Sequence, residues 1–107
     1  MTITEKREMT MVMLGLSDND SERLIEVYLN AAAKEIIAWR YSYSGQMPEE
    51  VPPEYEMTQV YAVIAGYSQA GAENQISHSE NGISRTFKHE DMISYIRANV
   101  IPLAGVL

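Results

Sequence analysis

The residues best suited to chemistry lie in one polar stretch, residues 75–88 (QISHSENGISRTFK). It holds three serines, a histidine, a glutamate and an arginine, and hydrolases build a nucleophile, a base and an orienting acid from such side chains. Ser77 and His78 are adjacent, however, and neighbours on an extended strand point to opposite faces. No G-x-S-x-G element accompanies them. We therefore interpret the serines as ordinary strand residues and predict no catalytic residue.

Metal and cofactor sites have equally weak support. His78 and His89 are eleven positions apart and lack the H-x-x-x-H spacing of a helical metal site. Asp18-x-Asp20 begins an EF-hand pattern, but Arg23 stands where that loop requires glycine. The chain has no cysteine and no glycine-rich phosphate loop. We expect no metal, no cofactor and no disulfide.

Charge is distributed unevenly along the chain. The net charge is -7, from 15 acids and 8 bases. Residues 41–84 carry six glutamates and no lysine or arginine, whereas residues 85–107 carry more bases than acids. This distribution does not indicate a basic surface that would bind a phosphate backbone. The acidic middle is either a solvated surface, or a surface that meets a basic partner or repels DNA in a passage.

Length and hydropathy predict a single soluble domain. The chain has 107 residues, of which 46% are hydrophobic. No apolar run approaches the ~20 residues of a membrane span. The N-terminus lacks the order of basic and apolar residues that marks a signal peptide. We therefore expect a protein made in the cytoplasm, with no membrane partner.

The elements that must position the polar stretch are helices. Thr2 and Glu5 have capping-box spacing, and Gly15 suits a left-handed cap, which predicts a first helix that ends near Leu14. The predicted apolar face of this helix consists of Met9, Val12 and Met13. A second helix, about residues 20–42 with Asn19 as its N-cap, has a single apolar seam. That seam is formed by Ile25, Leu29, Ala32, Ile36, Trp39 and Tyr43.

Two further helices are predicted, about residues 53–73 and 89–100. The apolar face of the third is expected to contain Met57, Val60, Tyr61, Ile64 and Tyr67. Beside it, Ala62, Gly66 and Ala70 form a ridge of small residues, which would let another helix approach closely. The predicted core includes Ile25, Leu29, Ile36, Trp39, Val60, Ile64, Ile93 and Ile96.

The polar stretch itself predicts a β-hairpin. Asn81-Gly82 is the strongest short hairpin signal, because both residues accept the positive φ of a type I′ turn. Both arms partly alternate apolar with polar residues. The predicted fold class is thus mainly α: a small four-helix domain with a short hairpin, about residues 75–88, between the third and fourth helices. An apolar tail, about residues 101–107, either packs on its own helices or docks into a neighbouring protein.

This order of elements, followed by I-x-x-S-E-x-G-I-S-x-T-F at residues 76–87, resembles the head–tail connector (adaptor) family of tailed bacteriophages. Members resemble one another by an S-E-x-x-G or G-x-S-x-S-Y type signature after the third helix. Ser79-Glu80 stands for the acidic pair, Thr86 for the second small hydroxyl and Phe87 for the aromatic residue. The resemblance covers most of the chain and implies one helical connector domain, residues 1–107.

The resemblance also implies a function. Connectors are structural virion proteins that form a ring, dodecameric in the particle, beneath the portal protein. The ring extends the DNA channel, through which DNA passes without sequence-specific binding, and docks the next neck component, a stopper or tail-completion protein. The implied location is the head–tail neck of the virion, after synthesis in the host cytoplasm. Two alternatives stay open: a helical regulatory protein or assembly chaperone that acts by protein binding, and a small hydrolase or metal enzyme.

We hypothesise that the hairpin and the tail make the protein contacts. The predicted interface residues are Ile76, Glu80, Asn81, Gly82, Ile83, Arg85, Phe87, Ile101, Leu103, Val106 and Leu107. The predicted acidic partner surface consists of Glu49, Glu50, Glu54 and Glu56. Because no base lies between Arg40 and Arg85, we expect Arg85 to pair with one of these acids on a neighbouring subunit.

Overall fold

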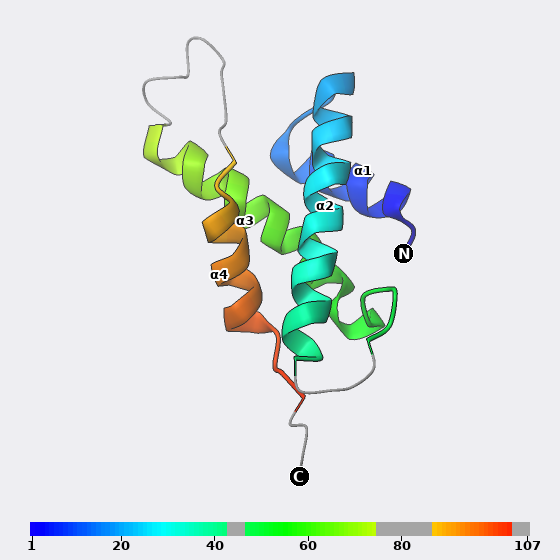
Figure 1. The fold of residues 1–107 in the computed structure, drawn as a ribbon. Coiled ribbons are helices and arrows are strands. Elements are labelled where there is room, and N and C mark those ends of the chain that lie inside the picture. The colour runs from blue at the N-terminus through cyan, green and yellow to red at the C-terminus, as the bar shows by residue number, and fades with distance from the viewer. Residues whose placement is uncertain (43–46, 75–86, 104–107) are drawn as a thin grey trace.

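Four α-helices are packed together in the part of the chain that the computed structural model describes, residues 1–42, 47–74 and 87–103; the side chains of residues 68–74 are outside this description. The helices are α1 (Ile3–Leu14), α2 (Asn19–Arg40), α3 (Glu56–Asn74) and α4 (His89–Asn99), and a 3-10 turn, η1 (Pro53–Tyr55), precedes α3. α2 and α3 each pack against the other three helices, with α1 and α4 to either side (Figure 1).

Local signals set the ends of the first two helices. Thr2 Oγ1 accepts the Glu5 N–H at 3.1 Å, and the Glu5 carboxylate accepts the Thr2 N–H at 2.7 Å, so the predicted capping box is present. Gly15 is left-handed (φ 73), as predicted. The N-cap of α2 is Asp18 and not Asn19 as predicted. Asp18 accepts the Ser21 N–H and hydroxyl at 2.9 and 2.7 Å, and these hydrogen bonds hold the pKa of its carboxyl below the usual value.

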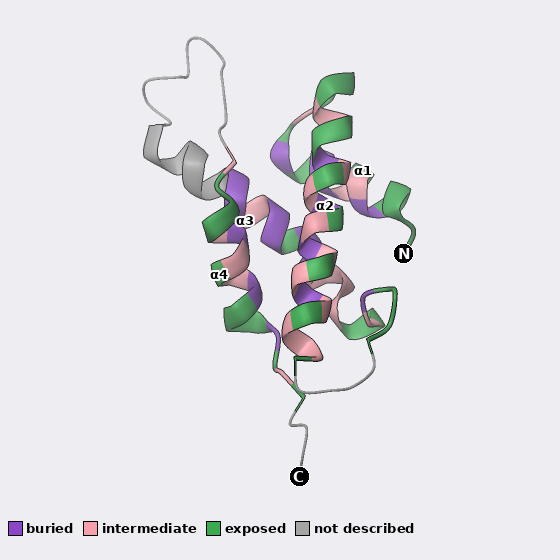
Figure 2. Ribbon diagram, viewed as in Figure 1, coloured by how far each residue is buried: buried purple, intermediate pink, exposed green. Residues whose placement is uncertain are grey.

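The core is built mainly from aliphatic side chains where the helices face one another (Figure 2). Of the predicted core residues, Ile25, Leu29, Ile36, Val60 and Ile96 are buried, and Trp39, Ile64 and Ile93 are half-buried. The buried set also includes Met11, Leu14, Ala32, Val51, Ala62, Val63, Tyr67, Met92 and Val100. Each fully buried aliphatic side chain stabilises the fold by about 1.5–3 kcal/mol, so these residues dominate the packing energy.

Met9, Val12 and Met13 share one face of α1, as predicted, but this face is not the one that packs into the core. Val12 and Met13 are 79% and 49% exposed, and Met9 is half-buried. The buried face carries Lys6 and Thr10 together with two apolar residues, Met11 and Leu14. Hydrophobic periodicity missed it because polar groups enter a core when they find hydrogen-bond partners there.

A chain of hydrogen bonds satisfies these buried polar groups. The Lys6 ammonium donates to Gln59 Oε1 at 2.7 Å, and Gln59 Nε2 donates to the backbone oxygen of Leu29 at 2.8 Å. Thr10 donates its hydroxyl to the Lys6 carbonyl at 2.7 Å. Glu56 Oε2 lies 3.9 Å from the Lys6 ammonium, and its negative charge balances the positive charge of Lys6. Three helices, α1, α2 and α3, are therefore joined by directional bonds as well as by apolar contact.

Packing on α3 also differs from the prediction. Tyr61 is 41% exposed, whereas Val63, which was not predicted to face the core, is completely buried. The nearest group to Gly66 is the aromatic ring of Phe87. A Cβ built on Gly66 would lie 2.9 Å from both Cδ1 and Cζ of Phe87, which is closer than real Cβ contacts. Glycine is required here because the Phe87 ring occupies the space of a side chain.

Phe87 belongs to an aromatic cluster that joins three segments. Its ring stacks on Tyr28 of α2, with centroids 3.8 Å apart and planes 8° apart. It also meets Tyr67 of α3 edge-on, at a centroid distance of 5.2 Å. The next residue, Lys88, donates its backbone N–H to the Gly66 carbonyl at 3.3 Å, and α4 begins one residue later. The cluster thereby fixes where α4 starts.

The fold class must be corrected, because the described residues are all-α and contain no strand. Of the hairpin predicted about residues 75–88, only Phe87 and Lys88 are described, and neither of them is in a strand. At its edges, α3 continues to Asn74, and Phe87 and Lys88 bind α3 instead of a partner strand. Residues 75–86, including Asn81-Gly82, lie outside the described residues. An alternating pattern with a good turn was insufficient evidence, since an isolated two-stranded ribbon is marginal in water.

We predict that Gly66→Ala destabilises the protein by roughly 1–3 kcal/mol, because the new methyl group overlaps the Phe87 ring. At an unhindered helix site the same exchange stabilises by about 1 kcal/mol. The sign should therefore reverse when Gly66→Ala is made in a Phe87→Ala background. Urea denaturation of the four chains measures both effects. A Gly66→Ala chain that is more stable than the wild type would show that the ring does not lie over Gly66.

We predict that Lys6→Met destabilises the fold by about 1–3 kcal/mol, because Gln59 Oε1 loses its donor inside the core. The Lys6→Met/Gln59→Leu double variant should cost less than the sum of the two single variants, since it removes both polar partners. Lys34→Met, at an exposed position of α2, is the control. Additive effects in a thermal denaturation series would contradict the hydrogen-bonded pair.

Candidate assembly surfaces

The first part of the C-terminal tail is held by its backbone. Val100 is buried, and its carbonyl accepts the Trp39 indole N–H at 3.0 Å. Arg40, the last residue of α2, donates its guanidinium to the Ile101 carbonyl at 2.5 Å, and its own carbonyl accepts the Leu103 N–H at 2.8 Å. The end of α2 therefore fixes the path of residues 100–103. We call this set of bonds the tail latch.

Aromatic rings support the tail latch from both sides. The Tyr55 hydroxyl accepts the Ile101 N–H at 3.3 Å, and the Arg40 guanidinium lies 5.4 Å from the centre of the Tyr55 ring. The Arg97 guanidinium lies 5.2 Å from the Trp39 ring. Such cation–π contacts contribute about 0.5–1 kcal/mol each at exposed sites. η1, α2 and α4 thus all help to orient one short segment.

The side chains of the tail face solvent even though its backbone is held. Ile101 is 69% exposed and Leu103 is 36% exposed. The structure therefore places these two predicted interface residues on the surface, at one end of the bundle (Figure 1). Val106 and Leu107 lie outside the described residues. A fixed backbone that presents apolar side chains lowers the entropy cost of binding a partner.

The hairpin half of the predicted interface is mostly outside the described residues. That half comprises Ile76, Glu80, Asn81, Gly82, Ile83 and Arg85. Phe87 is described, and its half-buried ring packs within its own subunit against Tyr28, Tyr67 and Gly66. This contact gives Phe87 a structural role that the sequence pattern did not reveal.

The predicted acidic surface separates into two kinds of carboxylate. Glu49, Glu50 and Glu54 are exposed in the loop before α3 and in η1. Glu56 is half-buried, and its Oε2 accepts a hydrogen bond from the N-terminal ammonium at 3.0 Å. Only the first three carboxylates are therefore available to a partner without breaking an internal ion pair. Glu49 and Glu50 also line a hollow of about 240 Å³ beside the N-terminus.

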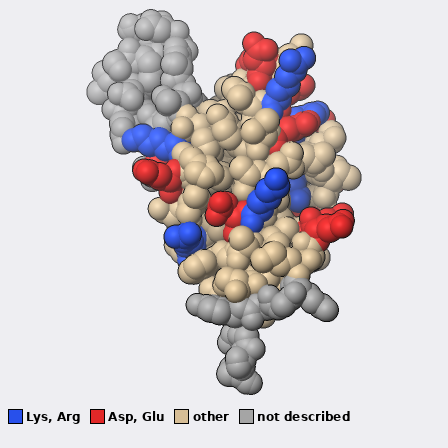
Figure 3. All heavy atoms as spheres, in the orientation of Figure 1, with Lys and Arg blue, Asp and Glu red and all other residues tan. Residues whose placement is uncertain are grey.

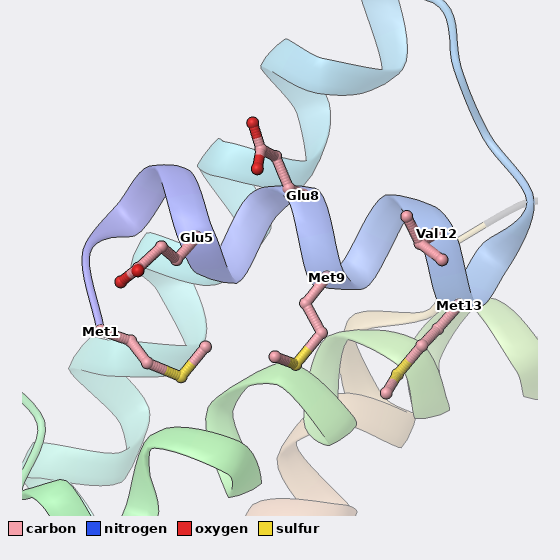
Figure 4. Close-up of a pocket in the computed structure, with 6 residues that line it drawn as sticks. All are labelled: Met1, Glu5, Glu8, Met9, Val12 and Met13. Atoms are coloured by element: carbon pink, nitrogen blue, oxygen red, sulfur yellow. The ribbon is translucent and has the colours of Figure 1, made fainter.

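A second hollow, of about 470 Å³, lies on the outer face of α1 (Figure 4). It is lined by Met1, Glu5, Glu8, Met9, Val12 and Met13. The sequence predicted that Met9, Val12 and Met13 share a face but did not show that this face lies on the surface.

Charged side chains of both signs are scattered singly over the face shown in Figure 3, with no large patch of one sign. Within the described ranges, no three candidate ligands among histidine, aspartate and glutamate come together as a metal site would require. His89 is exposed at the start of α4, and His78 lies outside the described residues. Across the same described ranges, the search for a helix with the length and hydropathy of a membrane span found none.

A family model described as phage gp6-like head-tail connector protein matches residues 10–98 of the chain. The chain belongs to this family. The match confirms the resemblance that the sequence motif indicated, and the connector family is one of structural virion proteins. No curated protein and no solved structure matches the chain at a significant level.

Membership in the connector family fixes the coarse function. The protein has a structural role at the junction of the phage head and tail, where it associates with itself and with other head or tail proteins. The matched residues contain α2, α3 and almost all of α4. Residues 1–9 and 99–107 lie outside the match. The family model therefore does not cover the capping box or the tail segment that the latch holds, whereas Trp39, Arg40 and Tyr55 of the latch lie within it.

We predict that Trp39→Phe loosens the tail latch, because the indole N–H that bonds the Val100 carbonyl is lost. Hydrogen exchange at the Leu103 amide should become roughly two- to tenfold faster, the range that corresponds to one hydrogen bond. The Val63 amide, in the buried middle of α3, is the internal reference and should not change. An unchanged Leu103 amide would contradict the role of Trp39 in holding the tail.

Proposed function

We propose that copies of this connector form a ring beneath the portal protein, extend the DNA channel and dock the next neck or tail component. The observation that carries the proposal is the family match over residues 10–98. The protein is made in the host cytoplasm, becomes part of the virion neck, and acts by binding alone, without catalysis or a cofactor. The ring is dodecameric in the particle.

The tail is the best-supported docking element. Ile101 and Leu103 are exposed apolar side chains on a backbone that is already held by Arg40, Trp39 and Tyr55. Exposed apolar residues of this kind act as anchors when a partner offers a hydrophobic pocket. We assign Ile101 and Leu103 to the contact with the portal or with the stopper, and Val106 and Leu107 to the same surface.

The acidic loop suits two roles in a ring. Glu49, Glu50 and Glu54 are exposed, and a surface with this charge repels the DNA backbone, so that DNA slides past without binding. The same carboxylates are available to Arg85 of a neighbouring subunit, the pairing expected from the sequence. Glu56 is the poorest partner of the four, because its carboxylate already binds the N-terminal ammonium and lies near Lys6.

The proposal is tested by mixing the purified chain with the portal protein of the same phage and weighing the complex by native mass spectrometry. We expect a complex with many copies of the chain on one portal. Replacement of both Ile101 and Leu103 by Asp should weaken binding at least about tenfold, because two apolar anchors become charged. The helices should stay folded, since the tail latch uses only backbone atoms of these residues.

Ser94→Asp, an exposed change on α4, is the matched control and should bind as the wild type does. Wild-type binding by the tail variant would exclude the tail from the docking surface. A wild-type chain that binds the portal as a single copy or a dimer, or does not bind it, would contradict the ring and favour a chaperone or regulator.

A further inference from the structure

The outer face of α1 combines exposed apolar residues with acids. Val12 and Met13 are 79% and 49% exposed, and Glu5 and Glu8 lie on the same side of the helix (Figure 4). Both bases of α1 point elsewhere. Lys6 is buried against Gln59 and Arg7 pairs with Glu26 of α2. The outer face of α1 is therefore apolar and net acidic.

The outer face of α2 has the opposite character. Leu24 and Val27 are 46% and 58% exposed, and Arg23 and Lys34 are exposed beside them. The residues on this side of α2, at positions 20, 23, 24, 27, 30, 31, 34 and 38, include two bases, Arg23 and Lys34, and one acid, Asp20 at the start of the helix. Among the described residues, no ion pair involves Arg23, Lys34 or Glu8.

The two faces also match in spacing. Glu8 lies one helical turn before Val12, and Arg23 lies one turn before Val27, which is about 6 Å along the axis in both helices. When the two helices lie side by side and parallel, valine meets valine and Glu8 meets Arg23. Opposite charges around a small apolar contact set the register of two helices.

The two faces point to different sides of the molecule. α2 passes in front of α1 in Figure 1, whereas α1 passes in front of α2 in the close-up of Figure 4. The two faces therefore cannot meet within one chain. A contact between unlike faces of identical subunits is heterologous, and successive copies of it close into a ring when the rotation allows.

We infer that the outer face of α1 in one subunit packs against the outer face of α2 in the next subunit. The inference rests on the proposed ring and specifies its subunit contact. Val12 and Met13 pack against Leu24 and Val27, and Glu8 pairs with Arg23. The occupant of each face is a second copy of this chain, because one face is net acidic and the other net basic around exposed apolar residues.

Disulfide trapping tests this contact directly, since the wild-type chain has no cysteine. Val12→Cys and Val27→Cys are made in separate chains of different mass, mixed in equal amounts at high concentration and oxidised. We expect the mixed Val12–Val27 dimer to exceed the ratio of random collision by about threefold or more, because a disulfide forms only between Cα atoms held within about 7 Å. Val12→Cys mixed with Ser94→Cys of α4 is the control and should give the random ratio.

Charge reversal provides the second arm. Glu8→Lys in the Val12→Cys chain, or Arg23→Glu in the Val27→Cys chain, should reduce the mixed dimer to the random ratio. Both reversals together should restore it, because the pair is re-formed with exchanged charges. Mixed dimers at the random ratio in the wild-type background, or an excess of Val12–Val12 dimers, would overturn the inference.

The outcome is separable from the proposed function. If the chain assembles in many copies on the portal but Val12 and Val27 do not cross-link there, the ring is correct and this subunit contact is wrong. If the chain does not assemble on the portal and cross-links only at random, both are wrong.

Discussion

The placement of Phe87 over Gly66 is the constraint on which the arrangement of the helices most depends. The ring fills the space that a side chain on α3 would occupy and stacks on Tyr28 of α2. The following residue bonds the backbone of α3, and α4 begins at once. One aromatic side chain therefore joins α2, α3 and the start of α4. It also links the family motif to the fold, because the aromatic residue of the motif acts inside the subunit.

A second set of contacts holds the helices and the tail while leaving apolar side chains exposed. Lys6, Gln59 and the carbonyl of Leu29 tie the inner face of α1 to α2 and α3. Polar groups thus fill part of the inner face of α1, and Val12 and Met13 lie on its outer face. At the other end of the bundle, backbone bonds hold residues 100–103 and leave Ile101 and Leu103 exposed.

The sequence predicted the helices well where local chemistry decides their ends. The capping box of Thr2 and Glu5 and the left-handed Gly15 needed no tertiary information. The apolar seam of α2 was also readable, because Ile25, Leu29 and Ile36 repeat with the helical period and are buried. The sequence did not predict features that depend on a contact with a residue far away in the chain. The buried face of α1 depends on Gln59, and the need for glycine at position 66 depends on Phe87. The predicted hairpin rested on a turn signal without tertiary contacts, and such a ribbon has little stability of its own.

The central claim is that this chain is a lasting part of the neck, and its copy number in finished particles tests that claim most directly. Quantitative mass spectrometry of purified virions, calibrated against the portal protein, gives that number. A connector ring predicts a fixed ratio close to one chain for each portal subunit. Absence of the chain from complete virions, when it is abundant in infected cells, would contradict the account and would show that it acts during assembly without becoming part of the particle.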